Sequence, residues 1–374
     1  MGLRRKKSGD NSLSEGFTLV EMLVATVILV LIMALVFTMT DQTSKIWKSS
    51  TAQIQSFQAA RAAYDTLTMR LRQATLNTYL DYYDNETPPE TYAAFLAANP
   101  SGTFIPAAYA RNSDLHFVVD QAAHIFTGTQ TLHPGHAVFF QAPLGFTANP
   151  ASYGPLQNML NACGYYVEFN TDKPSFPPFL SSSAVVHERY RYRLMEFLQP
   201  AEANTIYSIP YNLNTPISQY EQWFTNFLPT SAGQVNNPAS GAPYHVLAEN
   251  IIALILSPEL TPTDQSIAPN YTYDSRAGGI TTTTSWHHQL PPLLRVVMVA
   301  IDEPSAIRLN PNGNSTVPAV ISNFFAGGSN PLFQSAGNLD SDLSTLTQAL
   351  NASKVSYRVF DTNIAIRGAK WSTQ

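Results

Sequence analysis

Histidine and cysteine side chains are the residues of this sequence best suited to ligating a metal. His133 and His136 enclose a Pro-Gly turn, and His287 and His288 are adjacent in the chain. A zinc site needs three or four ligands, and neither pair has a third one near it in the sequence, because Cys163 stands alone. We therefore expect structural or surface histidines, with no metal and no other cofactor.

Polar residues near the C-terminus begin like a calcium loop without completing it. Asn338, Asp340 and Asp342 alternate correctly, but Leu343 and Ala349 stand where the loop needs glycine and glutamate. The sequence also lacks the nucleophile elbow, the phosphate-binding glycine loop and the zinc-peptidase histidine motif. We expect no enzymatic activity.

Glu21 is a carboxylate in an unusual place. It is the only charged residue in the apolar run from Phe17 to Thr40. An ionised carboxylate inside a bilayer costs about 2.5 to 3.5 kcal/mol, so Glu21 needs a compensating partner there. One candidate partner is the positive end of its own helix dipole, since Glu21 lies near the start of the run. The other is a positive charge on a separate group.

This apolar run is long enough to span a membrane. As a helix it rises about 36 Å, against a hydrocarbon core of about 30 Å. Basic residues at positions 4–7 precede it, and such clusters stay in the cytoplasm. We predict a cytoplasmic leader at residues 1–16, a transmembrane helix at residues 17–40 and an extracytoplasmic remainder. A secretory signal peptide would have a shorter apolar core, and a plain anchor would leave Glu21 unexplained.

Gly16, Phe17 and Glu21 belong to the string G-F-T-L-V-E, which leads directly into the apolar run. This arrangement resembles the processing motif of type IV pilins and type II secretion pseudopilins. The resemblance implies that a prepilin peptidase cleaves after Gly16 and N-methylates the new amine of Phe17. It also implies that Glu21 pairs with the N-terminus of a neighbouring subunit during assembly. That amine, with an unperturbed pKa of about 8, supplies the positive charge that Glu21 needs.

The helical pattern continues beyond the membrane segment. Apolar residues recur at spacings of three and four, at Phe57, Ala60, Tyr64, Leu67, Leu71 and Ala74. We predict one helix from about Phe17 to about Leu76, with an amphipathic extension over residues 41–80 that packs on the globular domain. Its solvated face is expected to carry Arg61, Asp65, Arg70 and Arg72.

The rest of the chain, residues 81–374, is expected to form an extracytoplasmic α+β domain in which the long N-terminal helix packs on antiparallel β-sheet. Expected strands cover residues 116–120, 137–141, 164–170, 189–197, 248–256, 293–302 and 355–366. A short helix is expected to be capped by Asp340 or Ser341, with Leu343, Leu346 and Leu350 on one face. Clusters of Pro, Asn, Thr and Ala predict long loop insertions at residues 81–110, 141–160, 226–245 and 258–290.

A second resemblance concerns the order of segments in this domain. The strings YRYRL at residues 190–194, LAENIIALIL at 247–256 and LPPLLRVVMVAID at 290–302 follow the helix, with Trp286 before the last. This order resembles the J-type minor pseudopilins, although the chain is longer and its loops have no counterpart there. The chain is also similar to prepilin-motif proteins of verrucomicrobial gene cassettes.

Composition narrows the class of partner. Charged residues make up only 13% of the chain while Pro (26), Tyr (18) and Phe (20) are frequent, which favours an exported β-rich protein. The formal net charge of −5 gives no basic surface for phosphates, so we expect no nucleic-acid partner. The expected partners are the prepilin peptidase/N-methyltransferase, other pilin or pseudopilin subunits and membrane lipid.

Two functions are compatible with these patterns. In the first, the chain is a minor pilin-like or pseudopilin-like subunit of a type II secretion or type IV pilus-like filament, anchored in the inner membrane with a periplasmic domain until it is extracted. In the second, the filament or membrane displays a binding module, adhesin-like and glycan-binding, with Trp223 and Trp286 as stacking residues. Exposed aromatic rings would favour the second function, and buried rings would favour assembly alone.

Overall fold

The computed structural model describes residues 18–86, 89–126, 131–156, 158–173, 176–177, 179, 186–208, 220–228, 243–277, 286–325 and 331–371. The chain forms two compact units that divide after Thr51. The helix α1, Leu19–Leu71, runs through the end of the first unit and into the second.

The second part of α1 supplies one wall of the core of the larger unit. The predicted apolar stripe is confirmed: Ala60, Tyr64, Leu67 and Leu71 are buried, and Phe57 is partly buried. The helix ends at Leu71, before the Leu76 expected, because the chain turns there and the Thr75 amide donates to the carbonyl of Gln141 at 3.0 Å.

The described strands form three sheets, in which neighbouring strands are antiparallel. The six-stranded sheet has the order β7-β6-β5-β4-β3-β9, the three-stranded sheet the order β11-β10-β8, and β1 pairs with β2 alone. The strands are β1 Tyr79–Tyr83, β2 Ala108–Asn112, β3 Val118–Gln121, β4 His136–Pro143, β5 Leu160–Thr171, β6 Tyr190–Gln199, β7 Tyr244–Glu249, β8 Ile251–Glu259, β9 Tyr273–Asp274, β10 Leu293–Ile301 and β11 Tyr357–Ala365.

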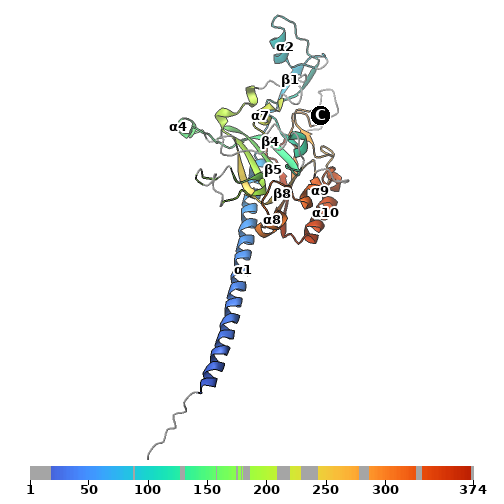
Figure 1. Ribbon diagram of the computed structural model, residues 1–374. Helices are drawn as coiled ribbons and strands as arrows, with labels where there is room; N and C mark the ends of the chain where they lie inside the picture. Colours follow the sequence, from blue (N-terminus) through green and yellow to red (C-terminus); the bar gives the residue numbers. More distant parts are fainter. Residues whose placement is uncertain are drawn as a thin grey trace, which may run out of the picture. The chain divides into compact units, whose positions relative to one another are not determined.

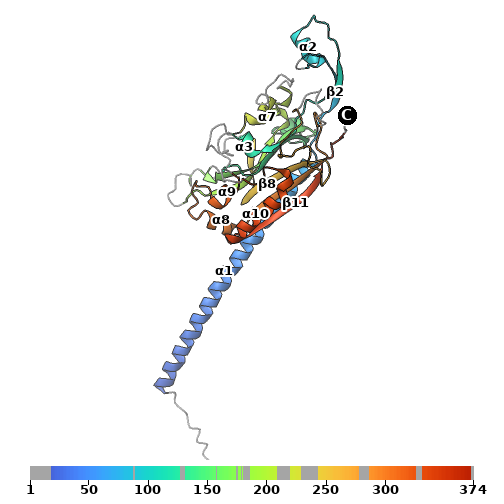
Figure 2. The same cartoon turned by 90° about the vertical axis from the view of Figure 1, so that its right-hand side faces the viewer.

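Short helices connect these strands, and the three near the C-terminus, α8, α9 and α10, gather beside the three-stranded sheet (Figures 1 and 2). The α-helices are α2 Tyr92–Ala98, α3 Ala122–Ile125, α4 Pro150–Tyr153, α7 Gln222–Thr225, α8 Glu303–Leu309, α9 Ala319–Phe325 and α10 Leu339–Ala352. The 3-10 turns are η2 Ala201–Ala203, η3 Ile206–Ser208 and η5 Ala336–Asn338.

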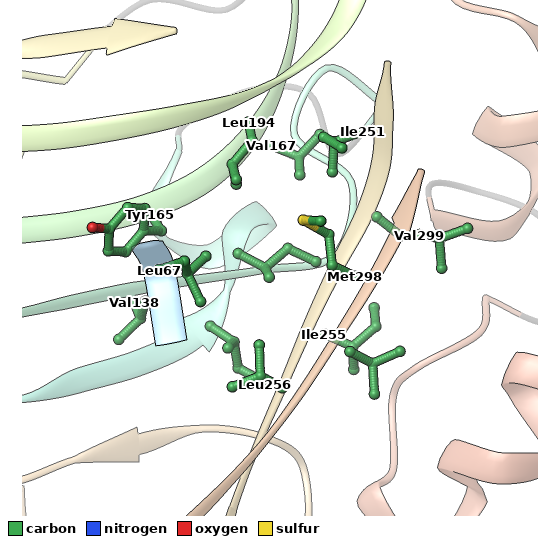
Figure 3. Close-up of a cluster of buried hydrophobic side chains, with 14 of the residues drawn as sticks. Leu67, Val138, Tyr165, Val167, Leu194, Ile251, Ile255, Leu256, Met298 and Val299 are labelled. Atoms are coloured by element: carbon green, nitrogen blue, oxygen red, sulfur yellow. The ribbon is translucent and has the colours of Figure 1, made fainter. Parts of the chain in front are cut away.

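The core lies where α1 and the two larger sheets meet. Figure 3 shows Leu67 of α1 among side chains of both sheets, including Val138, Tyr165, Leu256 and Met298. All five side chains are fully buried, so the apolar faces of the helix and of the sheets bury one another. The α+β fold with a pilin-like helix on antiparallel sheet, predicted from the sequence, is confirmed.

Several sequence expectations differ from the structure. Residues 81–110 are not only loop, because β1, α2 and β2 form an arm that projects from the larger unit in both views (Figures 1 and 2). The N-cap of α10 is Asn338, not Asp340 or Ser341, and its side chain makes no capping bond. Arg70 does not lie on a solvated face, since its guanidinium pairs with the buried carboxylate of Glu196. The expected loop at 226–245 falls largely on residues outside those described.

Candidate functional site

The first turn of α1 is closed by Thr18 and Glu21. The Thr18 amide and hydroxyl each donate to Glu21 Oε2 at 2.9 Å, and the Glu21 amide donates to Thr18 Oγ1 at 3.3 Å. This reciprocal arrangement is a capping box, in which a Thr before the helix and a Glu three residues later satisfy the free amides of the first turn. Glu21 therefore has hydrogen-bond partners within its own chain.

Thr18 was not singled out from the sequence, although the signal was present. The spacing T-x-x-E before an apolar run is the sequence signature of a capping box. The structure thus adds Thr18 to the site that Glu21 defines. Gly16 and Phe17, the predicted processing residues, lie outside the described residues, so cleavage and methylation there remain predictions, as does assembly through Glu21.

The apolar side chains after this first turn are exposed. Leu19 is 81% exposed and Phe37 is 71% exposed, and the most apolar window of α1 has a mean hydropathy of 2.9 with none of it buried. By length and composition this helix can cross a membrane. Its polar groups suit that environment, because the hydroxyls of Thr26 and Thr38 donate to the carbonyls of Leu23 and Leu35.

Trp223, a predicted stacking residue, lies in the core. Its side chain is 0% exposed, and its indole N–H donates to Nδ1 of His116 at 3.1 Å. The other ring nitrogen of His116 lies 2.6 Å from Oδ1 of Asp274, so the histidine is held between the indole and the carboxylate. Trp286 is half-buried and packs against the core. A ring enclosed like that of Trp223 presents no face to a ligand.

Exposed aromatic rings lie instead on the arm formed by β1, α2 and β2. Tyr82 is 53% exposed and Tyr109 is 58% exposed. The two residues pair across β1 and β2, which brings their ring centroids to 4.8 Å. Cross-strand partners point to the same face of a ribbon, so these rings form one small aromatic surface.

The histidines and the cysteine singled out from the sequence are structural. His133 stacks on Phe126 with ring centroids 4.0 Å apart, and His136 Nδ1 accepts from the Leu256 amide at 3.0 Å. Burial lowers the pKa of His136 to about 4, and burial raises the pKa of the Cys163 thiol.

His287 and His288 are buried against one another. The described part of the chain contains no group of three or more His, Cys, Asp or Glu placed to hold a metal ion.

The calcium-like residues make contacts of another kind. Asp340 pairs with Arg295 of β10 at 2.8 Å, and Asp342 accepts from the Phe333 amide at 2.7 Å. These bonds attach α10 to its neighbours, which gives the carboxylates a structural role.

In comparison with known proteins, the segment that contains the first turn of α1 matches a family motif. Residues 11–37 match the model described as the prokaryotic N-terminal methylation motif, a range that contains Gly16, Phe17, Thr18 and Glu21. No curated protein and no solved structure matches the chain. The motif implies processing by a prepilin peptidase and assembly with other pilins. The chain therefore carries a prepilin-type N-terminal methylation motif, which supports its place among the type IV pilin-like proteins.

Proposed function

We propose that this protein is a minor subunit of a type II secretion or type IV pilus-like filament. The observation that carries the proposal is the methylation motif at residues 11–37, set on the first turn of an apolar helix whose side chains are unburied. An unburied apolar helix needs lipid or the helices of other subunits around it. The membrane provides lipid before assembly, and a filament core of packed helices provides the helices of other subunits afterwards.

The proposed sequence of events follows from the motif. The leader is cut between Gly16 and Phe17, the new amine is methylated, and Glu21 pairs with the amine of a neighbouring subunit. Before assembly the capping box with Thr18 satisfies Glu21 within the chain. The leader stays cytoplasmic and the globular unit is extracytoplasmic in this proposal. The large size of the unit from Ala52 to Gln374 favours a low-copy subunit over a major shaft subunit.

The finer assignment is to the J-type minor pseudopilins or to the prepilin-motif proteins of verrucomicrobial cassettes. The order of β6, β8 and β10 with Leu290 and Pro291 just before β10 supports it.

We also propose that the chain is not an enzyme. Of the histidines considered from the sequence, His133 stacks on Phe126 and His136 accepts from the Leu256 amide in the core, which supports that assignment.

Intact-mass spectrometry of the native membrane protein tests the processing step. The wild-type chain should begin at Phe17 and carry one added methyl group, whereas replacing Gly16 with Leu should leave the leader in place. Glu21→Ala serves as the matched control, because it should be cleaved normally. A wild-type chain that keeps residues 1–16 would overturn the proposal and leave a plain membrane anchor.

A second candidate function is a binding module displayed on the filament or membrane. The exposed pair Tyr82 and Tyr109 on the projecting arm favours it. Isolated exposed apolar residues are ordinary, but a paired aromatic surface on a projecting ribbon is a typical feature of binding sites. Replacing both tyrosines with serine should leave processing and filament assembly intact while lowering adhesion of the cells; equal adhesion would remove this candidate.

A further inference from the structure

The arm formed by β1, α2 and β2 encloses a groove on the side of its ribbon opposite to Tyr82 and Tyr109. The groove has a volume of about 510 Å³. That size suits a small ligand or one or two side chains of a partner. Alanines of α2 form one wall, and the other lining residues include Tyr79, Asp81, Glu90, Asp114, Tyr207 and Arg276.

The carboxylates of this groove are held in place by the chain around them. Asp114 Oδ2 accepts from the side-chain Nδ2 of Asn77 at 2.8 Å, and Asp114 Oδ1 accepts from the Tyr79 hydroxyl at 3.4 Å. The segment that carries Glu90 is fixed because the Glu90 amide donates to Asp84 Oδ1 at 2.8 Å. Asp81 Oδ1 accepts from the Tyr82 amide at 2.8 Å. A site whose polar groups are fixed in advance loses less entropy when a ligand binds.

Arg276, which also lines the groove, has its guanidinium turned toward the protein. Arg276 is 2% exposed and donates to the carbonyls of Tyr220 and Asp114. The three carboxylates, in contrast, are half-buried or exposed, so a ligand meets their negative charge first. A cleft lined by charge of one sign concentrates ligands of the opposite sign.

Aromatic rings complete the lining. Tyr79 and Tyr207 are 39% and 63% exposed, and both belong to the groove. A cationic group that lies over an aromatic face is attracted by the electron-rich ring, and the attraction grows as the group is desolvated. Carboxylates together with tyrosine faces are therefore complementary to an ammonium or guanidinium group. A polyanion such as nucleic acid would be repelled.

We propose that this groove binds lysine or arginine side chains of an extended basic polypeptide segment. The inference goes beyond the second candidate function, since the groove lies on the other side of the ribbon from Tyr82 and Tyr109 and would take a basic partner. It is independent of processing and assembly, because every lining residue belongs to the unit from Ala52 to Gln374.

Fluorescence anisotropy with a labelled oligolysine peptide tests the proposal on the full-length protein in detergent micelles. Binding is expected, and it should weaken as salt is raised, because exposed charges are screened. The double variant Asp81→Asn, Glu90→Gln should bind about tenfold more weakly or worse, and Asp81→Asn keeps the oxygen that accepts from Tyr82. Ala97→Leu should also weaken binding, because it fills the groove without changing charge or helix propensity.

The matched control removes the same number of charges outside the groove. Glu86 and Asp65 are exposed, so the double variant Glu86→Gln, Asp65→Asn should bind the peptide like the wild type. An equal loss in both double variants would show general electrostatic attraction and overturn the proposal. Binding of a labelled neutral oligosaccharide without binding of oligolysine would also overturn it and identify a glycan site. Failure of filament assembly in cells would leave the anisotropy result unchanged, so the two proposals fail separately.

Discussion

At the scale of single residues, Glu21 has two competing partners. Within its own chain it accepts two hydrogen bonds from Thr18, which closes the first turn of α1. In the proposed filament it pairs with the amine of a neighbouring chain. The first interaction needs only an acceptor oxygen, whereas the second needs a negative charge. The two roles can therefore be separated by a substitution that keeps the oxygen and removes the charge.

Glu21→Gln is that substitution. The amide oxygen of glutamine can still accept from Thr18, so membrane insertion and cleavage of the leader should match the wild type. Co-purification of other filament subunits should be lost, because no charge remains to pair with the neighbouring amine. Affinity purification followed by mass spectrometry measures both. If the Gln variant recovers the same subunits as the wild type, the cap alone accounts for the presence of Glu21.

Glu221 makes the stability of the larger unit depend on pH. Burial, with the carboxylates of Asp274 and Asp120 nearby, raises the pKa of Glu221 to about 8 from an ordinary 4.5. Between these two pH values the folded protein holds a proton that the unfolded chain has released. The contribution of Glu221 to the free energy of unfolding is therefore fully present below about pH 4.5, and it is lost as the pH rises toward 8.

Glu221→Gln should remove that dependence. Thermal unfolding at about pH 4 should give similar midpoints for wild type and variant, since both side chains are neutral there. Near pH 9 the variant should unfold at the higher temperature, because only the wild type then buries a charge. A difference between the two proteins that stays constant across this range would contradict the assignment.

At the scale of elements, Arg70 connects α1 to the six-stranded sheet. Its guanidinium pairs with Glu196 of β6, whose carboxylate also accepts from the Tyr165 hydroxyl at 2.6 Å and lies 2.7 Å from His245 Nε2. Burial acts to raise the pKa of Glu196, but the hydrogen bonds of His245 and Tyr165 and the charge of Arg70 hold that pKa below its usual value. The carboxylate is only 2% exposed, so it depends on these partners.

Arg70→Met should lower the free energy of unfolding by about 3 kcal/mol, the lower end for a broken buried ion pair, because the buried Glu196 carboxylate keeps only Tyr165 and His245 as partners. Arg61→Met is the matched control on the same helix. Its ion pair with Asp65 is long, at 3.7 Å, and both side chains are more than 60% exposed, so it should change stability by less than about 1 kcal/mol. Urea unfolding compares the two variants, and equal losses would exclude a special role for Arg70.

Gly164 of β5 allows close contact with β4. It lies opposite Phe139, and a Cβ at Gly164 would stand 2.3 Å from the Phe139 ring, which is itself stacked on Phe224 at 4.1 Å. Gly164→Ala should therefore cost about 1 to 3 kcal/mol of stability by displacing this ring. Gly337→Ala is the control, since its nearest atom is 4.0 Å away. A loss no larger than that of the control would show that the ring moves freely.

The elements predicted from sequence were those with regular apolar patterns. The strands β8 and β10 were predicted because they are nearly continuous runs of buried aliphatic residues, and the stripe on α1 was predicted because its apolar residues recur at spacings of three and four. The arm was missed because its alanine-rich helix α2 and short ribbon have the composition of a loop. The contact of His116 with Asp274, which are 158 positions apart, has no local signal. The groove at the arm could not be predicted for the same reason, since its residues meet only in the fold.

At the scale of the whole molecule, the two units are suited to different environments. Between Leu19 and Thr51, the described side chains are exposed or half-buried and include many large apolar ones. From Ala52 onward the chain has its own apolar core and its own hydrogen-bonded sheets. The first unit is suited to lipid or to packed helices, and the second is suited to water. In the proposals made above, anchoring and recognition thus belong to separate parts of one chain.

A fragment that begins at Ala52 should therefore fold without the membrane segment. Among the described residues the buried core starts at Ala60, so removing the segment up to Thr51 takes away no described core side chain. Its free energy of unfolding in buffer should lie within about 1 kcal/mol of that of the same unit in the full chain in micelles, as judged by near-UV circular dichroism during urea unfolding. The fragment lacks Glu21 and the apolar helix, so it should neither enter a filament nor block one when supplied in excess, while still binding oligolysine. A fragment that aggregates or lacks a cooperative transition would show that the globular unit depends on the segment before Ala52, and recognition could then not be separated from anchoring.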